Sequence, residues 1–222
     1  MELTEFDKLV HNCTECKELP FGYAIKYYPI ISFGNPVNKP LLVIGLNPSD
    51  HEYVGNYVSN SNLIEERHRS QINYFMKKPY TFFKNLMKFF DNPVKNKLGW
   101  ARSPWEKVGY LDIVKCPTRK NLRAGNQWSY FSETEKEKIL MNCSPYLALQ
   151  LRSLSPKLLM AYGKDVCRWF YPNYEEKTDA FLVRKCKVLT VFEGNVVLVP
   201  QTRGSHSAEK IQKVKKTIIE NI

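Results

Sequence analysis

The sequence has no long apolar run, no internal repeat and no low-complexity tract. A helix that crosses a bilayer needs about 20 consecutive, mostly apolar residues, and no stretch of the 222 residues approaches that length. The first ten residues also lack the basic patch and apolar core of a secretory signal. We therefore expect a cytoplasmic protein with no membrane partner, and the length favours a single domain over residues 1–222.

Acidic residues are scarce relative to basic ones. The chain has 33 Lys and Arg against 22 Asp and Glu, a net charge of +11, and 13% of its residues are aromatic. Phosphate contacts dominate affinity for nucleic acids, and aromatic rings stack on exposed bases. The composition therefore favours a nucleic-acid partner, although a generally basic, solvated surface would have the same composition.

Residues 41–50, with the sequence LLVIGLNPSD, read as a buried strand that ends in a tight turn. Four apolar residues run into Gly45, Asn47 and Pro48, so the turn presents Asn47 at the carboxyl end of the strand. Ligands of open α/β sheets bind at that edge. An ordinary strand exit can also carry G-x-N-P, so this motif depends on support from the rest of the chain.

Strands and helices are expected to alternate along the chain. Further strands are predicted at residues 108–114 and 157–161, extended runs at 187–192 and 195–200, and helices at 62–77, 79–90, 132–153 and 207–220. The two extended runs would turn around Glu193-Gly194, and residues 171–185 read as irregular. This alternation predicts a three-layer α/β/α fold with a central, mainly parallel four-stranded sheet.

Six cysteines are present, and four of them form a pattern. Cys13 and Cys16 make a C-x-x-C pair, Cys116 follows the second predicted strand, and Cys143 lies on the inward face of the long helix. In a reducing compartment thiols stay free unless a metal or a redox function claims them. A C-x-x-C pair fits one edge of a metal or iron–sulfur site, whereas Cys143 alone fits a buried structural cysteine equally well.

Four features in this order resemble the iron–sulfur-containing, family 4-like members of the uracil-DNA glycosylase superfamily. They are the C-x-x-C pair in the N-terminal segment 1–40, the G-x-N-P motif, the strand exit Asp112-Ile-Val-Lys-Cys-Pro117, and the stretch from Cys143 to Gly163 with its Pro-Tyr-Leu, Gln-Leu and Pro-Lys. The resemblance implies a monofunctional DNA glycosylase that flips a base out of DNA and hydrolyses its bond to deoxyribose. The product would be an abasic site, formed in base-excision repair or in antiviral defence.

The resemblance also implies that Cys13, Cys16, Cys116 and Cys143 ligate a 4Fe–4S cluster, with zinc as the alternative. The gap between Cys116 and Cys143 is longer than is usual in the family, which suggests an inserted loop at residues 122–131. No small-molecule cofactor is expected besides the metal site, and we expect a monomer.

Carried over from the family, Asn47 would position the attacking water, with Asp50 as a helper or a helix cap. His206 would stabilise the leaving base, although the family's His-Pro-Ser is replaced here by Ser205-His-Ser207. Arg203 is the alternative for this role.

The remaining roles concern the base and the DNA. Either Tyr57 or Tyr53 would stack on the flipped base, since the family keeps an aromatic residue in that loop. Arg203, Lys115 and Arg119 would contact the DNA.

Asp112 departs from the family pattern. The family has an asparagine there, whose amide donates to O4 of uracil and accepts from N3–H, whereas an ionised carboxylate only accepts. It would repel O4 but suit the exocyclic amino group of a modified cytosine, a base found in some viral DNA. Uracil stays open as the substrate if Asp112 is protonated or turned away. A catalytically weak or inactive iron–sulfur nucleic-acid-binding protein of the same fold is the other alternative.

Overall fold

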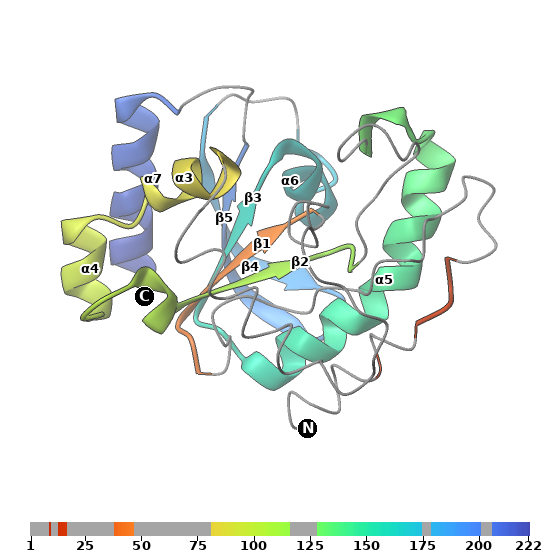
Figure 1. Ribbon diagram of the computed structural model, residues 1–222, viewed down its shortest axis with the longest axis horizontal. Coiled ribbons are helices and arrows are strands. Elements are labelled where there is room, and N and C mark those ends of the chain that lie inside the picture. The colour runs from red at the N-terminus through yellow and green to blue at the C-terminus, as the bar shows by residue number, and fades with distance from the viewer. Residues whose placement is uncertain are drawn as a thin grey trace, which may run out of the picture.

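The computed structural model describes residues 9, 13–16, 38–46, 81–115, 128–174, 179–200 and 206–222. A five-stranded sheet lies between two layers of helices (Figure 1). Its order is β2-β1-β3-β5-β4, formed by β1 (Leu41–Gly45), β2 (Val108–Asp112), β3 (Leu158–Tyr162), β4 (Phe181–Val188) and β5 (Phe192–Val199). All neighbours pair in parallel except β4 with β5. The predicted α/β/α class is confirmed, but the sheet has five strands rather than four.

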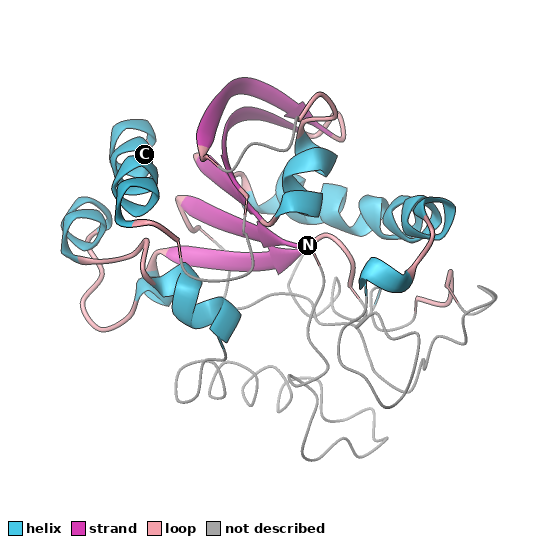
Figure 2. Cartoon of the chain, turned by 90° about the horizontal axis from the view of Figure 1, so that it is seen from above, coloured by secondary structure: helices cyan, strands magenta, loops and turns pink. Residues whose placement is uncertain are grey.

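Helices cover both faces of the sheet (Figure 2). One layer holds α3 (Thr81–Met87), α4 (Asn92–Leu98) and α7 (Ala208–Asn221), and the other holds α5 (Glu133–Leu154) and α6 (Lys164–Phe170). Among the described residues, two 3-10 turns, η3 (Pro104–Glu106) and η4 (Trp128–Tyr130), lie in the connections. Within the described residues no helix is both long and apolar enough to cross a membrane.

Every residue of β1 is buried, because each face of this central strand meets a different apolar cluster. Leu41 and Val43 pack with the layer of α3, α4 and α7, whereas Leu42 and Ile44 pack with α5 and α6. Residues of one strand that are two apart share a face, so Gly45 lies on the same face as Val43.

The long helix α5 begins with a capping box. The Ser132 hydroxyl accepts from the Glu135 backbone N–H at 3.3 Å, and the Glu135 carboxylate accepts from the Ser132 N–H at 2.7 Å. Cys143 is buried, with 4% of its surface exposed, as the helical spacing predicted. The cap thus fixes where the helix starts and which residues face the sheet.

The hairpin of β4 and β5 corrects two predictions. Its turn lies at Leu189 and Thr190, which have φ values of 49° and 57°, and not at Glu193-Gly194. The segment 171–185 is not irregular throughout, since β4 already begins at residue 181. Tight hairpin turns favour positive φ and usually use Gly or Asn there, so Leu and Thr gave no turn signal. Gly194 lies inside β5, where an added Cβ would come within 2.6 Å of the Phe192 ring.

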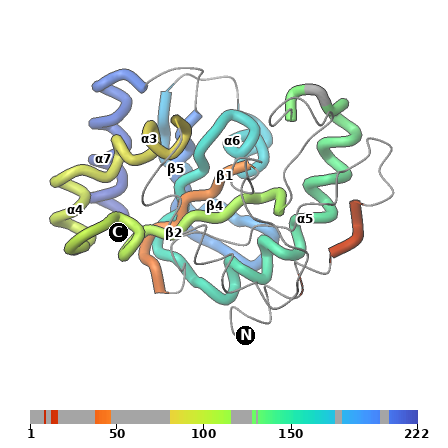
Figure 3. Tube along the Cα trace, viewed as in Figure 1, coloured from red at the N-terminus to blue at the C-terminus, as the bar shows by residue number. Residues whose placement is uncertain are grey.

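Helices α4 and α7, far apart in sequence, lie side by side (Figure 3). The Lys215 ammonium, which is buried, forms an ion pair with the Asp91 carboxylate at the start of α4. Val94 and Val214 pack in the same apolar cluster. The C-terminal helix therefore supports the helical layer that covers one face of the strand ends.

Candidate active site

The carboxyl ends of four strands lie in register at one edge of the sheet. Gly45 of β1 pairs with Asp112 of β2, and Tyr162 of β3 pairs with Val199 of β5. Because β1 pairs in parallel with both β2 and β3, the expected arrangement of the two strand exits at one edge is confirmed. Asn47 follows Gly45 by two residues and itself lies outside the described residues.

Asp112 is a buried carboxyl with 3% of its surface exposed. The Tyr110 hydroxyl donates to Oδ1 of Asp112 at 2.8 Å, and the Lys115 ammonium donates to the backbone carbonyl of Asp112. Burial raises the pKa of Asp112 to about 7, while the Tyr110 hydrogen bond and the Lys115 charge act in the opposite direction. Near neutral pH the side chain therefore exchanges between an acceptor-only carboxylate and a carboxylic acid that can donate.

Gly45 leaves the space in which Tyr110 and Asp112 form their hydrogen bond. An added Cβ would lie 1.8 Å from the Tyr110 hydroxyl oxygen and 2.5 Å from Oδ1 of Asp112. Gly45 does not have a positive φ, so glycine is needed here for close approach and not for backbone conformation. The hydrogen bond between Tyr110 and Asp112 thus lies directly over the neighbouring strand.

His206 is another buried polar residue near the strand ends, with 7% of its surface exposed. Its Nε2 lies 3.0 Å from the Tyr162 hydroxyl, and its ring lies 4.9 Å from that of Phe89. Burial lowers the pKa of His206 to about 4, helped by the charges of Lys210 and Lys88. The ring is therefore neutral at pH 7, and its buried Nδ1 has no hydrogen-bond partner among the described residues.

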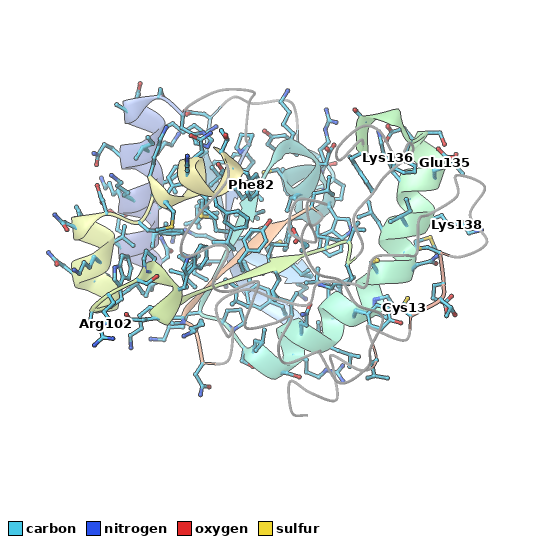
Figure 4. All side chains as sticks on the ribbon, viewed as in Figure 1. Cys13, Phe82, Arg102, Glu135, Lys136 and Lys138 are labelled. Carbon is cyan, nitrogen blue, oxygen red and sulfur yellow. The ribbon has the colours of Figure 1, made fainter. Side chains whose placement is uncertain are left out.

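Phe82 links the two polar groups. Its half-buried side chain projects from α3 (Figure 4), and its ring lies 6.1 Å from that of Tyr110 and 4.9 Å from that of Tyr162. Asp112 bonds to the first tyrosine and His206 to the second. These contacts at the strand ends thus connect the Asp112 carboxyl with the neutral imidazole of His206.

Lys115, which was expected to contact DNA, is turned inward in this structure, and its DNA contact stays a prediction. Only 1% of its surface is exposed, and its ammonium also donates to Oε1 of Gln150 on α5 at 2.6 Å. After β2 the chain continues along β1, because the backbone N–H groups of Ile113 and Val114 donate to the carbonyls of Gly45 and Leu46 at 3.0 and 2.8 Å. This path turns Lys115 inward, where it holds the strand exit in place.

The C-x-x-C segment docks on α5. The Asn142 amide donates to the carbonyl of Glu15 at 3.1 Å and to the sulfur of Cys16 at 3.5 Å, and Cys16 packs against the apolar cluster that contains Cys143. Cys13 lies beside the same helix (Figure 4). The structure therefore brings residues 13–16 to the helix that carries Cys143.

The pKa of the Cys143 thiol depends on its burial and on the cysteines near it. Burial raises the pKa of Cys143 to about 12, and the nearby Cys16 and Cys13 act in the same direction. Thiolates are the ligands that iron–sulfur clusters and zinc prefer, so these residues suit such a group in kind. No set of three or more His, Cys, Asp or Glu in the described part of the chain is arranged to hold a metal ion. The expected fourth ligand, Cys116, lies outside that part.

Several other predicted site residues also lie outside the described residues, and their roles stay predictions. They are Asn47, Asp50, Tyr53, Tyr57, Arg119 and Arg203.

Sequence reasoning missed the roles of Tyr110, Tyr162 and Gly45. Tyr110 lies two residues before Asp112, and the alternation of a strand already places both on one face. The part played by Gly45 required the register between β1 and β2. No sequence pattern indicates the role of Tyr162, because its hydrogen-bond partner His206 is 44 residues away.

The fold defines an α/β protein with a mainly parallel sheet, and ligands of such sheets bind at the carboxyl edge. A sequence model of the uracil DNA glycosylase superfamily matches residues 31–220, so the chain belongs to this superfamily. The comparison with curated proteins gave no match. Members of the superfamily are generally DNA glycosylases, which gives DNA as the partner. The matched range includes His206 and α7, a part of the chain that the sequence motifs covered only loosely.

Proposed function

We propose that the protein flips a modified cytosine out of DNA and hydrolyses its N-glycosidic bond, leaving an abasic site. Asp112 carries this proposal, because it is buried at the strand end with one carboxyl oxygen bound by Tyr110. An ionised carboxylate accepts from the 4-amino group of a cytosine and repels the O4 of uracil. Removal of ordinary cytosine would damage the cell's own genome, so a modified cytosine in viral DNA, and hence a defence role, fits best.

Uracil excision in repair is the second candidate, and one observation favours it. Burial raises the pKa of Asp112 to about 7, so a protonated fraction exists at neutral pH. A protonated carboxyl both donates and accepts, and it could meet uracil as the family's asparagine amide does.

The proposed reaction needs a positioned water and a donor near the leaving base. Loss of the base leaves an oxocarbenium-like sugar and places negative charge on the base. Asn47, aided by Asp50, would hold the water, and Tyr57 or Tyr53 would stack on the base. Arg203 and Arg119 would contact the DNA.

His206 would donate to the base oxygen as a neutral imidazole. The pKa of Tyr162 is raised by burial, so its hydroxyl keeps its proton and can donate to Nε2 of His206. The single ring proton then lies on Nδ1, the nitrogen without a described partner. Tyr162 would thus select the histidine tautomer that donates to the base.

His206→Ala is expected to reduce single-turnover base excision by about 100-fold, since loss of one donor to a developing anion has an effect of that order. Tyr162→Phe should cause a smaller loss, because the imidazole stays but its tautomer is no longer fixed. The measurement is abasic-site formation on an oligonucleotide, with thermal unfolding as a check that the variants fold. An unchanged rate in His206→Ala would show that another group, such as Arg203, has this role.

We also propose that Cys13, Cys16, Cys116 and Cys143 hold a 4Fe–4S cluster, as in the family 4-like members, with zinc as the alternative. Such a group would tie the N-terminal segment to α5. The docking of Cys16 on α5 through Asn142 supports this proposal.

Anaerobically purified protein should be brown with broad visible absorbance. Cys143→Ser should lose the colour and unfold at lower temperature, because a thiolate ligand is removed. Cys186→Ser is the matched control, since Cys186 is also buried but lies on β4, and this variant should stay brown. Colourless protein with bound zinc would favour the alternative, and protein without metal would contradict both.

A further inference from the structure

We infer that Tyr110 is a positioning residue that fixes which carboxyl oxygen of Asp112 meets the flipped base. It would thereby set the preference for bases with an amino group at C4 over bases with a carbonyl there. This inference rests on the base-reading role proposed for Asp112.

The Tyr110 ring is held rigidly. Only 3% of the residue is exposed, and the ring packs edge-on against Phe83 and Phe82, with centroids 5.0 and 6.1 Å away. A phenol oxygen lies in the plane of its ring, so a fixed ring fixes the position of the hydroxyl. Tyr110 therefore supplies a donor whose place does not depend on the carboxyl that it binds.

This donor restricts the orientation of Asp112. With Oδ1 bound to Tyr110 at 2.8 Å, rotation of the carboxyl about its Cβ–Cγ bond breaks the hydrogen bond. Gly45 lies close to the same oxygen, since an added Cβ at this position would come within 2.5 Å of Oδ1. Because Oδ1 is bound by Tyr110, Oδ2 is the oxygen that we assign to the base.

Tyr110 also favours the ionised form of Asp112. A hydrogen bond donated to a carboxylate stabilises the charged state, and it is the largest influence lowering the pKa of Asp112 against the effect of burial. The titratable groups that face Asp112 from the described elements are Tyr110 and Lys115, and the Lys115 ammonium bonds to the backbone carbonyl. Without the hydroxyl, more of Asp112 would be protonated and able to donate to O4.

Tyr110→Phe tests this inference because it keeps the packed ring and removes only the hydroxyl. Single-turnover excision is measured on oligonucleotides that carry 5-hydroxymethylcytosine, 5-methylcytosine or uracil, across pH 6 to 9. The ratio of cytosine-derivative to uracil excision should fall about tenfold, the effect of one hydrogen bond to a charged group. The pH of half-maximal cytosine-derivative excision should move upward. A residue with only a structural role would lower all rates together and leave the ratio and the pH profile unchanged.

The matched control is Tyr174→Phe. Tyr174 is another buried tyrosine, its ring stacks on Phe181 of the edge strand β4, and it packs in the apolar cluster on the opposite face of the sheet from Tyr110. This variant should keep both the ratio and the pH profile of the wild type.

An infrared titration of the Asp112 carboxyl separates this inference from the proposed function. The carboxylic C=O band that disappears in Asp112→Asn should titrate at higher pH in Tyr110→Phe than in wild type. An unchanged midpoint, or a shifted midpoint with an unchanged base ratio, would overturn the role of Tyr110. If wild-type protein released no base from any oligonucleotide, the proposed function would fail, and the titration would still show whether Tyr110 controls Asp112.

Discussion

Asp112→Asn is expected to shift excision from a cytosine derivative toward uracil, changing the ratio of the two rates about 100-fold. The amide can donate to O4 of uracil, which a carboxylate cannot do. The wild-type carboxyl accepts from Tyr110 through Oδ1, and the amide oxygen can keep that bond. The change therefore alters the group that meets the base with little change in packing.

The measurement is the single-turnover rate on matched oligonucleotides with uracil or 5-hydroxymethylcytosine. Asp179→Asn is the control, because Asp179 is an exposed carboxylate paired with Lys213 and should not affect base choice. Efficient uracil release by the wild type, without action on cytosine derivatives, would refute the assigned role of Asp112.

Protein stability gives a second readout for the same variant. Burial raises the pKa of folded Asp112 to about 7 from an ordinary value of 3.8, so the folded state holds more protons than the unfolded state between these pH values. The contribution of Asp112 to the free energy of unfolding therefore falls as pH rises from about 4 to about 7. Asp112→Asn lacks this fall, so chemical denaturation should show it gaining stability relative to wild type as pH rises through that range.

Gly45→Ala is expected to destabilise the protein by about 1–3 kcal/mol, the range for overpacking a buried site. The new Cβ would lie 1.8 Å from the Tyr110 hydroxyl oxygen, so Tyr110 or β1 must move. Either shift breaks the alignment of Tyr110 with Asp112, and discrimination between bases should fall as well. Chemical denaturation and the ratio of base excision rates measure the two effects.

The double variant Gly45→Ala/Tyr110→Phe tests whether Gly45→Ala destabilises the protein through a clash with the Tyr110 hydroxyl. Removing the hydroxyl eliminates the closest contact and leaves the ring carbon Cζ, which lies 2.6 Å from the position that an alanine Cβ would take. The destabilisation caused by Gly45→Ala should therefore be smaller in the Tyr110→Phe background. Equal destabilisation in both backgrounds would mean that the two residues do not compete for this space.

The sequence predicts an element of the fold where its local pattern and its burial both indicate the same structure. The buried run at residues 41–45 and the capping box at Ser132 each specify one element. The hairpin of β4 and β5 did not follow, because Leu189 and Thr190 occupy positive-φ positions without a glycine. Gly194, the residue that did suggest a turn, makes room for the Phe192 ring.

The site was predictable at the level of the sheet edge but not at the level of contacts. A strand exit such as Asp112 can be recognised from the residues around it. The contact of Tyr110 and Asp112 over Gly45 depends on the register of two strands, which no local pattern specifies. Nearness to a strand end does not tell whether a side chain turns outward or inward, and the Lys115 side chain turns toward Gln150.

Abasic-site formation by the wild-type protein is the most direct test of the proposed activity. Oligonucleotides identical except for one cytosine, 5-methylcytosine, 5-hydroxymethylcytosine or uracil are incubated with the protein, and strand cleavage at abasic sites is quantified. We expect abasic sites at a cytosine derivative in preference to uracil, and none at unmodified cytosine. Binding to all oligonucleotides without abasic sites at any base would contradict the proposal and favour a non-catalytic nucleic-acid-binding protein of this fold.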